Sequence, residues 1–251
     1  MRTIRVRGKT AVPLKPRIPQ RWLPLLREVG ALAAAEDAAA YAVGGCVRDW
    51  LLGRPVRELD VMVEGDSLAA ARALASAHRG TVREHPQFLT ATVEYHAGRR
   101  RQRVDVAACR QETYRAPAAY PRVSPGTLHD DLRRRDFTVN AMAMSLAPAT
   151  FGALIDDYHG RDDLAARVIR ALHARSFEDD PSRILRAIRF AERLQFTIEP
   201  QTAAWMREAL HKGWLSRLNC GRLRKELLAM LAEPDPLACL RALGRQLADA
   251  A

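Results

Sequence analysis

The spacing of apolar residues changes along this chain, and the change limits the folds that it can adopt. Between residues 40 and 110, short apolar runs typical of strands alternate with helical segments. From Asp180 onward the spacing is helical almost to the end, with breaks near Pro200 and Pro234. We therefore predict an α+β fold: a mixed β-sheet with flanking helices, then an all-helical part, with the boundary between residues 150 and 175.

The predicted division is a basic N-terminal arm over residues 1–20, a mixed domain over 21–150 and a helical domain over 151–251. The arm lacks an apolar stretch and a small-residue cleavage site, so we expect an extended arm and not a signal peptide. Strands are expected at ELDVMVEG, TVREH, LTATVEY and QRVDVAACR. Helices are expected at RWLPLLREVGALAAAEDAA, from near Val47, and at DSLAAARALASAHRG. A proline-rich loop, YRAPAAYP to SPG, and a helix within DDLRRRDFTVNAMAMSL are expected to follow.

The composition favours a globular chain with an anionic partner. Hydrophobic residues make up 48% of the 251 residues, and 40 Lys and Arg against 29 Asp and Glu give a net charge of +11. Nucleic acid, nucleotide phosphate or an acidic membrane would fit this charge, as would a merely solvated basic surface. No apolar run is long enough to predict a membrane span. The four cysteines form no CxxC pair, which favours reduced thiols in a cytoplasm over a zinc site.

Two acids stand inside the apolar run VRELDVMVE. Glu58 and Asp60 are two residues apart, so in a strand they project from the same face. Neighbouring carboxylates repel unless a cation lies between them, and Mg²⁺ prefers such oxygen ligands. Asp105, in the strand-like RVDVA, would complete a two-metal site for phosphoryl transfer. A strand whose polar face meets solvent or arginine is the alternative.

The stretch GGCVRD lies just before these acids. Gly44 and Gly45 allow the backbone to approach a phosphate closely, and Arg48 would hold phosphate oxygens. Because Gly45 precedes Glu58 by 13 residues, the turn and the acids are candidates for one nucleoside triphosphate site. A Gly-Gly pair by itself marks only a turn.

Two further stretches combine arginine with polar side chains. In RRRDFTVNAMA, we expect Arg134, Arg135 and Asp136 at a helix start, with Asn140 on the same helix face as Asp136. Phosphate contacts by Arg135 and ribose or base contacts by Asp136 and Asn140 would fit. The alternative is a basic surface turn with Asp136 as a helix N-cap.

In DDPSRILRAIRF, arginines recur every third residue along a predicted helix. Arg183, Arg186 and Arg189 form a basic ridge, and Asp180 with Arg183 offers an acceptor and donors to a base edge. A solvated cationic helix face is the alternative.

Together these stretches resemble the class II tRNA nucleotidyltransferase and bacterial poly(A) polymerase family. The matching segments are GGCVRD, ELDVMVEGD, DLRRRDFTVNAMA, LIDDYHGRDDL and DDPSRILRAIRFAERL, in that order over residues 38–235. The resemblance implies a nucleotidyltransferase head followed by a helical, RNA-binding neck. It also implies template-independent, Mg²⁺-dependent addition of CMP and AMP from CTP and ATP to the tRNA 3′ end.

The resemblance also implies roles for individual residues. Those at the catalytic metal site are Glu58, Asp60 and Asp105, with Glu58 and Asp60 as metal ligands. Those at the nucleotide are Gly44, Gly45, Arg48, Arg135, Asp136, Asn140, Asp180, Arg183, Arg186 and Arg189.

The chain departs from the family pattern in three respects. Glu58 stands where the family usually has Asp, and Asp179 stands where it often has Glu. The C-terminal body and tail of the family are expected to be missing or very short.

These features leave three functions open. The first is addition of CCA, CC or A to tRNA, and the second is poly(A) polymerase activity. The third is a catalytically silent RNA-binding homologue, which Glu58 would favour. The segment RQETYRAPAAYPRVSPGTLHD is the candidate for a mobile loop that selects the product.

Overall fold

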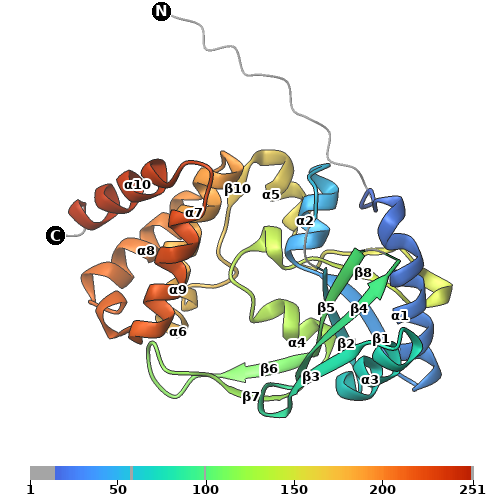
Figure 1. Cartoon of the computed structure of the whole chain (residues 1–251). Helices are drawn as coiled ribbons and strands as arrows, with labels where there is room; N and C mark the ends of the chain where they lie inside the picture. Colours follow the sequence, from blue (N-terminus) through green and yellow to red (C-terminus); the bar gives the residue numbers. More distant parts are fainter. Residues whose placement is uncertain (1–14, 57–58, 99, 250–251) are drawn as a thin grey trace, which may run out of the picture.

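A seven-stranded mixed sheet is the centre of the N-terminal part of the molecule (Figure 1). The computed structural model describes residues 15–56, 59–98 and 100–249, and within them the strand order is β3-β4-β5-β2-β1-β8-β9. The strands of this sheet are β1 (Ala39–Val43), β2 (Leu59–Glu64), β3 (Thr81–His85), β4 (Thr90–Ala97), β5 (Arg100–Ala108), β8 (Ala143–Ser145) and β9 (Leu154–Ile155).

The pairing of the strands explains why the sheet is mixed. β2 and β5 run parallel at its centre, whereas every other described pair in this sheet is antiparallel. Helices α1 (Leu23–Ala35) and α3 (Ser67–Ala77) contact each other and cover one face of the sheet. The short helix α2 (Gly45–Leu51) follows β1 directly. The mixed sheet with flanking helices that the sequence predicts is therefore confirmed.

Helix α3 shows how the sequence sets these boundaries. The Asp66 carboxylate accepts hydrogen bonds from the backbone N–H groups of Leu68 at 3.0 Å and Ala69 at 2.9 Å. These bonds satisfy donors that a helix start otherwise leaves without partners. Ala71 and Leu74 are fully buried against the sheet, so the helix ends are set by capping and its orientation by apolar packing.

The C-terminal part is a group of helices centred on α7, which contacts α9 and α10. Its helices are α5 (Gly160–Ala166), α6 (Ser176–Asp179), α7 (Ser182–Leu194), α8 (Pro200–His211), α9 (Cys220–Leu231) and α10 (Pro236–Ala248). The parallel strands β10 (Val168–Ile169) and β11 (Thr197–Ile198) join the segment before α6 to the end of α7. Helices α8 and α10 begin at prolines, where the missing N–H does no harm.

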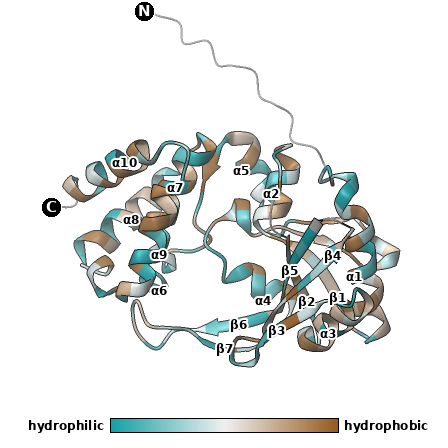
Figure 2. Ribbon diagram, in the orientation of Figure 1, coloured by the Kyte–Doolittle hydropathy of each residue, from teal (hydrophilic) through white to brown (hydrophobic). Residues whose placement is uncertain are grey.

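The predicted proline-rich loop is wrong in part, because its residues Arg122–Pro125 form a strand of a hairpin. Strand β6 (Arg110–Thr113) pairs antiparallel with β7 (Arg122–Pro125). Pro125 is tolerated because it ends a two-stranded ladder and needs no N–H there. The hairpin extends from the sheet toward α6 and α9 (Figure 1), and its strand β6 is largely hydrophilic (Figure 2). It therefore connects the two parts of the molecule.

The predicted helix start at Arg134 is also wrong. Helix α4 (Leu128–Arg133) ends there, and a 3₁₀ turn, Thr138–Asn140, leads into strand β8. The successive residues Ala143 and Met144 of β8 are fully buried, which suits a strand covered on both faces better than a surface helix. Packing therefore overrides the local helix preference of this segment.

The domain limits at residues 20 and 150 stay predictions, as most of the arm precedes the described residues. The sheet itself continues to β9 at Ile155. All four cysteines are free thiols, and three of them are buried. Within the described part of the chain, no helix has the length and apolar character needed to cross a membrane.

Candidate functional site

A cleft of about 660 Å³ lies between the sheet and the helices of the C-terminal part. Ten of the thirteen predicted site residues line it: Gly45, Arg48, Asp60, Arg135, Asp136, Asn140, Asp180, Arg183, Arg186 and Arg189. They come from α2, β2, α7 and the loops beside α4 and α6, which are far apart in the sequence. Gly44 adjoins Gly45, Asp105 lies beside Asp60, and Glu58 lies outside the described residues.

The acids of the site stand on the two central strands. Asp60 of β2 and Asp105 of β5 are direct partners in the parallel pair, so their side chains leave the same face of the sheet. Asp60 is exposed, and the Asp105 side chain is 35% exposed. The Thr92 hydroxyl donates to the Asp105 carboxylate at 2.6 Å, and the Arg103 guanidinium lies 3.3 Å from it. Two accessible carboxylates side by side are a fitting oxygen donor set for a divalent cation.

The described residues contain no group of three or more His, Cys, Asp or Glu side chains placed to hold a metal ion. Glu58, the predicted partner of Asp60, is outside that set, so its place on the same strand face stays a prediction. The Cys46 thiol is no candidate nucleophile, because burial first and the charge of Asp60 second raise its pKa to about 12.

Gly44 is required at the turn between β1 and α2. Its φ of +68° lies in the region that favours glycine, and a Cβ there would lie 2.6 Å from Nη1 of Arg135. The Arg135 guanidinium therefore packs directly against this backbone, and the Asp131 carboxylate holds it at 2.8 Å. The turn and the arginine form one wall of the cleft.

A buried chain of hydrogen bonds crosses this wall. Arg48 is 3% exposed; it binds the carboxylate of Asp49 and donates from Nη1 to Oδ1 of Asn140 at 2.6 Å. Asn140 donates from Nδ2 to the Asp136 carboxylate at 3.0 Å. Asn140 and Asp136 were predicted to share a helix face; they are in contact, but a 3₁₀ turn and not an α-helix brings them together. Asp136 in turn binds Nε of Arg186 at 2.9 Å.

The Asp136 carboxylate is ionised despite its burial. Desolvation by burial raises its pKa, but the charge of Arg186, the Asn140 amide and the charge of Arg183 together outweigh burial and leave the pKa at about 2. The same contact raises the pKa of Arg186, chiefly through the charge of Asp136. A buried ion pair therefore connects the loop after α4 to helix α7.

The ridge on α7 is buried in this wall rather than solvated. The guanidinium of Arg186 lies 3.6 Å from the Glu226 carboxylate, and that of Arg189 lies 3.4 Å from it. The guanidiniums of Arg48, Arg186 and Arg189 all lie within 5.3 Å of the ring centre of Phe190. This aromatic ring and these acids let several cations share a small volume.

The proposed base-reading pair is already held in place. The Asp180 carboxylate accepts from the Ser182 N–H at 2.9 Å and forms an ion pair with Arg222. Arg183 is 5% exposed and donates to the Arg134 carbonyl at 2.6 Å. Both side chains line the cleft in fixed orientations, which suits recognition by hydrogen bonding.

Comparison with known proteins places this arrangement in a family. The family model described as the poly(A) polymerase head domain matches residues 40–170, more than half of the chain. The chain belongs to this family. A second model, described as a probable RNA- and SrmB-binding site of polymerase A, matches residues 195–245. The predicted resemblance to tRNA nucleotidyltransferases and bacterial poly(A) polymerases is confirmed.

Members of the poly(A) polymerase head-domain family with known activities are similar to much of this chain. An A-adding tRNA nucleotidyltransferase of Halalkalibacterium halodurans is 39% identical over 86% of this chain and 50% of its own length. A CC-adding tRNA nucleotidyltransferase of Deinococcus radiodurans is 40% identical over 84% of this chain and 54% of its own. A solved CCA-adding enzyme without ligand, 40% identical, matches 93% of this chain and 54% of its own with a TM-score of 0.87. This family member thus spans about half the length of these relatives.

The structure also adds residues that sequence reasoning missed in this family member. Arg222 of α9 reaches Asp180 and donates to the Ala118 carbonyl at 3.1 Å, and Tyr120 lies beneath its guanidinium. Glu226 lies one turn further along α9 and binds the α7 arginines. The spacing of Arg222 and Glu226, four residues apart, is a signal for a shared helix face, but it does not indicate which partners they contact.

Proposed function

We propose that the chain transfers nucleotides from CTP or ATP to the 3′ end of tRNA without a template. One observation carries this proposal. Ten predicted residues from both parts of the molecule, Asp60 among them, line a single cleft beside Asp105. The activities in the names of the similar proteins, A-adding, CC-adding and CCA-adding, support it.

The residues of the cleft suit the parts of such a reaction. Arg48 and Arg135 lie beside the Gly44 turn, where they would bind and orient the triphosphate. Asp180 and Arg183 would select the base by side-chain hydrogen bonds, which replace a template strand.

We further propose Mg²⁺ as the cation of the carboxylate site. Asp60 and Asp105, with Glu58, are the side chains that would hold it, and their accessible oxygens fit a hard cation. When bound, the cation lowers the pKa of the attacking hydroxyl and offsets phosphate charge. The cytoplasmic location predicted from the free thiols stays part of this proposal.

Three tRNA substrates would test the function and identify the product. The tRNAs end before the first C, after one C and after CC, and each is offered labelled CTP or ATP alone. Addition of A to the CC-ended tRNA would exclude a CC-only enzyme. Efficient addition of C to a shortened tRNA would exclude a poly(A) polymerase. Absence of incorporation into all three tRNAs with Mg²⁺ present would refute the proposal.

Glu58 favours a second candidate, a catalytically silent RNA-binding homologue. Glutamate is one methylene longer than the aspartate that the family usually has, so it would shift any bound cation. We expect the wild type to be active and Glu58→Asp to retain activity. RNA binding without incorporation in both proteins would favour the silent homologue instead.

A further inference from the structure

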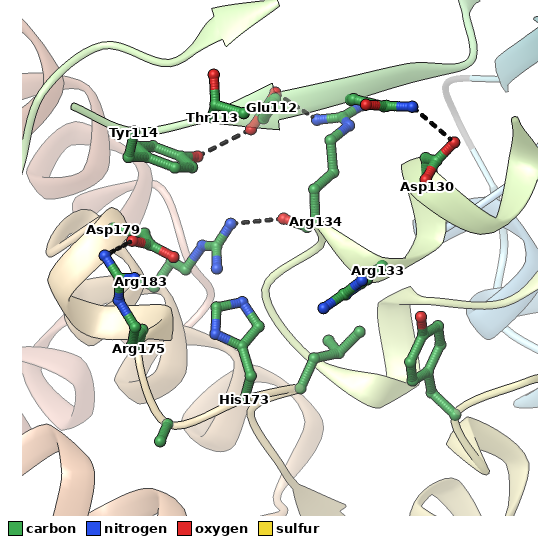
Figure 3. A pocket seen from close by; sticks show the side chains of 14 residues that line it. Glu112, Thr113, Tyr114, Asp130, Arg133, Arg134, His173, Arg175, Asp179 and Arg183 are labelled. Carbon is green, nitrogen blue, oxygen red and sulfur yellow. Dashed lines mark hydrogen bonds and ion pairs between the residues drawn. The ribbon is translucent and has the colours of Figure 1, made fainter. Parts of the chain in front are cut away.

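A second cavity, of about 710 Å³, adjoins the cleft and shares Glu112, Tyr114, Arg134 and Arg183 with it. It lies between strand β6, helix α4 and the segment 172–179 that leads to α7 (Figure 3). Of the predicted site residues that the structure describes, only Arg183 lines it. The proposed nucleotide site therefore does not account for this cavity.

Two guanidiniums of this cavity lack a carboxylate partner in the described part of the chain. Arg183 is buried and donates to neutral oxygens, the Ser176 hydroxyl at 2.7 Å and the Arg134 carbonyl at 2.6 Å. Arg133 is exposed and forms no hydrogen bond or ion pair with any described residue. Buried or crowded cations without counter-ions attract an anion from outside.

The acids of the cavity are engaged elsewhere. Glu112 binds Arg110 and Arg134 at 2.9 and 2.8 Å, and Asp130 caps helix α4 through Thr127. The remaining acid, Asp179, faces Arg175 at 3.5 Å. No described carboxylate lies within ion-pair distance of Arg133, so its guanidinium stays available to a ligand.

The imidazole of His173 lies in the positive potential of the arginines that line this cavity. In Figure 3, Arg133 and His173 point toward one another across the cavity, and Arg175 turns toward Asp179. Burial, and then the charges of Arg183, Arg133 and Arg175, lower the pKa of His173 to about 4. An anion placed among these groups would be attracted by the same three charges and would favour protonation of His173.

Aromatic rings border the same space. Tyr114 and Tyr158 line the cavity, and the ring of Tyr158 stacks with that of His129 at a centroid distance of 6.0 Å. Proteins hold single-stranded nucleic acid with cationic side chains that contact its phosphates and aromatic rings that stack with its bases. The volume lies within the range of ligand pockets.

We propose that this cavity binds a phosphate of the RNA strand whose 3′ end enters the adjoining cleft. Arg133 would contact the phosphate, and Tyr158 would support the neighbouring base. Arg175, whose side chain is 66% exposed, would turn from Glu178 and Asp179 to join Arg133 at the phosphate. This inference rests on the proposed function, because it takes RNA as the substrate. A phosphate of a free nucleotide has the same chemistry, but the nucleotide residues of the resemblance line the other cavity, which leaves this one for the strand.

The first test compares RNA binding by Arg133→Gln and Arg175→Gln with binding by Arg83→Gln. Arg83 is an exposed arginine on the outermost strand, lines neither cavity and matches the charge change. Fluorescence anisotropy with a labelled single-stranded RNA ending in CC should show about fivefold weaker binding for each cavity variant. The salt dependence of log Kd should fall by about 0.7 for each lost phosphate contact. Binding equal to that of Arg83→Gln would overturn the proposal.

The second test follows the His173 imidazole by NMR, assigned by its absence in His173→Gln. Addition of the RNA should raise the pKa of His173 above about 4, while the NMR signals of the exposed His96 on β4 stay unchanged at fixed pH. No change, or an equal change with pyrophosphate alone, would overturn the RNA site. Neither test requires incorporation, so RNA binding through Arg133 by an inactive protein would refute only the proposed function.

Discussion

The two walls of the cleft hold their charges in different ways. On the sheet wall, Asp60 is exposed and Asp105 half-exposed, and their strands place them side by side. On the opposite wall, Arg48, Asp136 and Arg186 are bonded into one network, with Arg48 and Asp136 buried. The first wall keeps carboxylate surface accessible to an incoming cation. On the second wall, ion pairs and hydrogen bonds within the protein already compensate most of the charge.

This difference separates two kinds of contribution to function. Accessible carboxylates add little to folding, so their replacement should affect the reaction alone. A buried ion pair between the loop after α4 and helix α7 fixes the relative position of the two parts, so its loss should lower stability first. Substitutions on each wall distinguish these two contributions.

Replacement of Asp60 should abolish most activity without unfolding the protein. We expect Asp60→Asn to lower nucleotide incorporation at least about 100-fold, because the site would lose a charge that we propose holds the cation. Because Asp60 is exposed, the free energy of unfolding should change by no more than about 0.5 kcal/mol. Incorporation and thermal unfolding are measured in parallel. The matched control is Asp162→Asn, because the Asp162 side chain on α5 is also exposed. A large loss of stability would show that the two walls do not differ as described.

Replacement of Asp136 should have the opposite profile. Asp136→Asn removes the closest carboxylate of Arg186, which keeps only Glu226 at 3.6 Å among the described carboxylates, and should lower the free energy of unfolding by about 3 kcal/mol. Urea denaturation measures this loss. The double variant Asp136→Asn with Arg186→Gln should recover part of it, because no unpaired charge remains. Equal losses for the single and double variants would contradict a direct pairing.

The same carboxylate makes stability depend on acid pH. The folded-state pKa of Asp136, about 2, lies below its ordinary value of 3.8, so its stabilisation is complete above pH 4. It should be lost as the pH falls from about 4 to 2. The free energy of unfolding of Asp136→Asn should therefore fall less steeply over this interval than that of the wild type. Parallel curves would show that another group titrates there.

Thr92 allows a finer test of the sheet wall. Its hydroxyl donates to Asp105 at 2.6 Å from the neighbouring strand, so it fixes the orientation of this carboxylate. Thr92→Val keeps the shape and removes the donor, and we expect about a tenfold loss of kcat with KM for the nucleotide unchanged. Thr92→Ser restores the hydroxyl and should recover the rate. Failure of the serine variant to do so would show that packing, and not the hydrogen bond, matters.

The sequence allowed many elements and most residues of the cleft to be predicted. Helix α3 and its cap at Asp66 follow from local rules, because a polar cap and an alanine-rich apolar face are readable in one segment. Strands β2 and β5 follow from their apolar runs. The stretches around Gly44, Asp60, Asp136 and Arg183 line one cleft. This could be predicted only from the family resemblance, because their spacing in the sequence does not connect them.

The errors arose where distant contacts decide the structure. The segment after Arg134 resembles a helix by itself, yet β8 forms because β1 and β9 offer partners on both sides. The hairpin β6–β7 could not be predicted, because its prolines favour a loop. They lie in the turn and at the end of the ladder, where a proline does not disrupt the pairing. Partners such as Arg222 for Asp180 were also beyond prediction, since they depend on how α9 packs against the rest.

The hairpin tip provides the last and smallest test, because Tyr120 lines the cleft and touches the helical part but carries none of the charges of the two walls. Tyr120 is 67% exposed, and the guanidinium of Arg222, which also binds Asp180, lies 5.5 Å from its ring centre. Tyr120→Ala should raise KM for the nucleotide about two- to fivefold, as expected for an exposed cation–π contact of about 0.5 to 1 kcal/mol. Tyr120→Phe keeps the ring and should behave as the wild type. If alanine and phenylalanine variants share the same KM, the tyrosine ring does not help Arg222 to hold Asp180, and the hairpin acts through its backbone contacts alone.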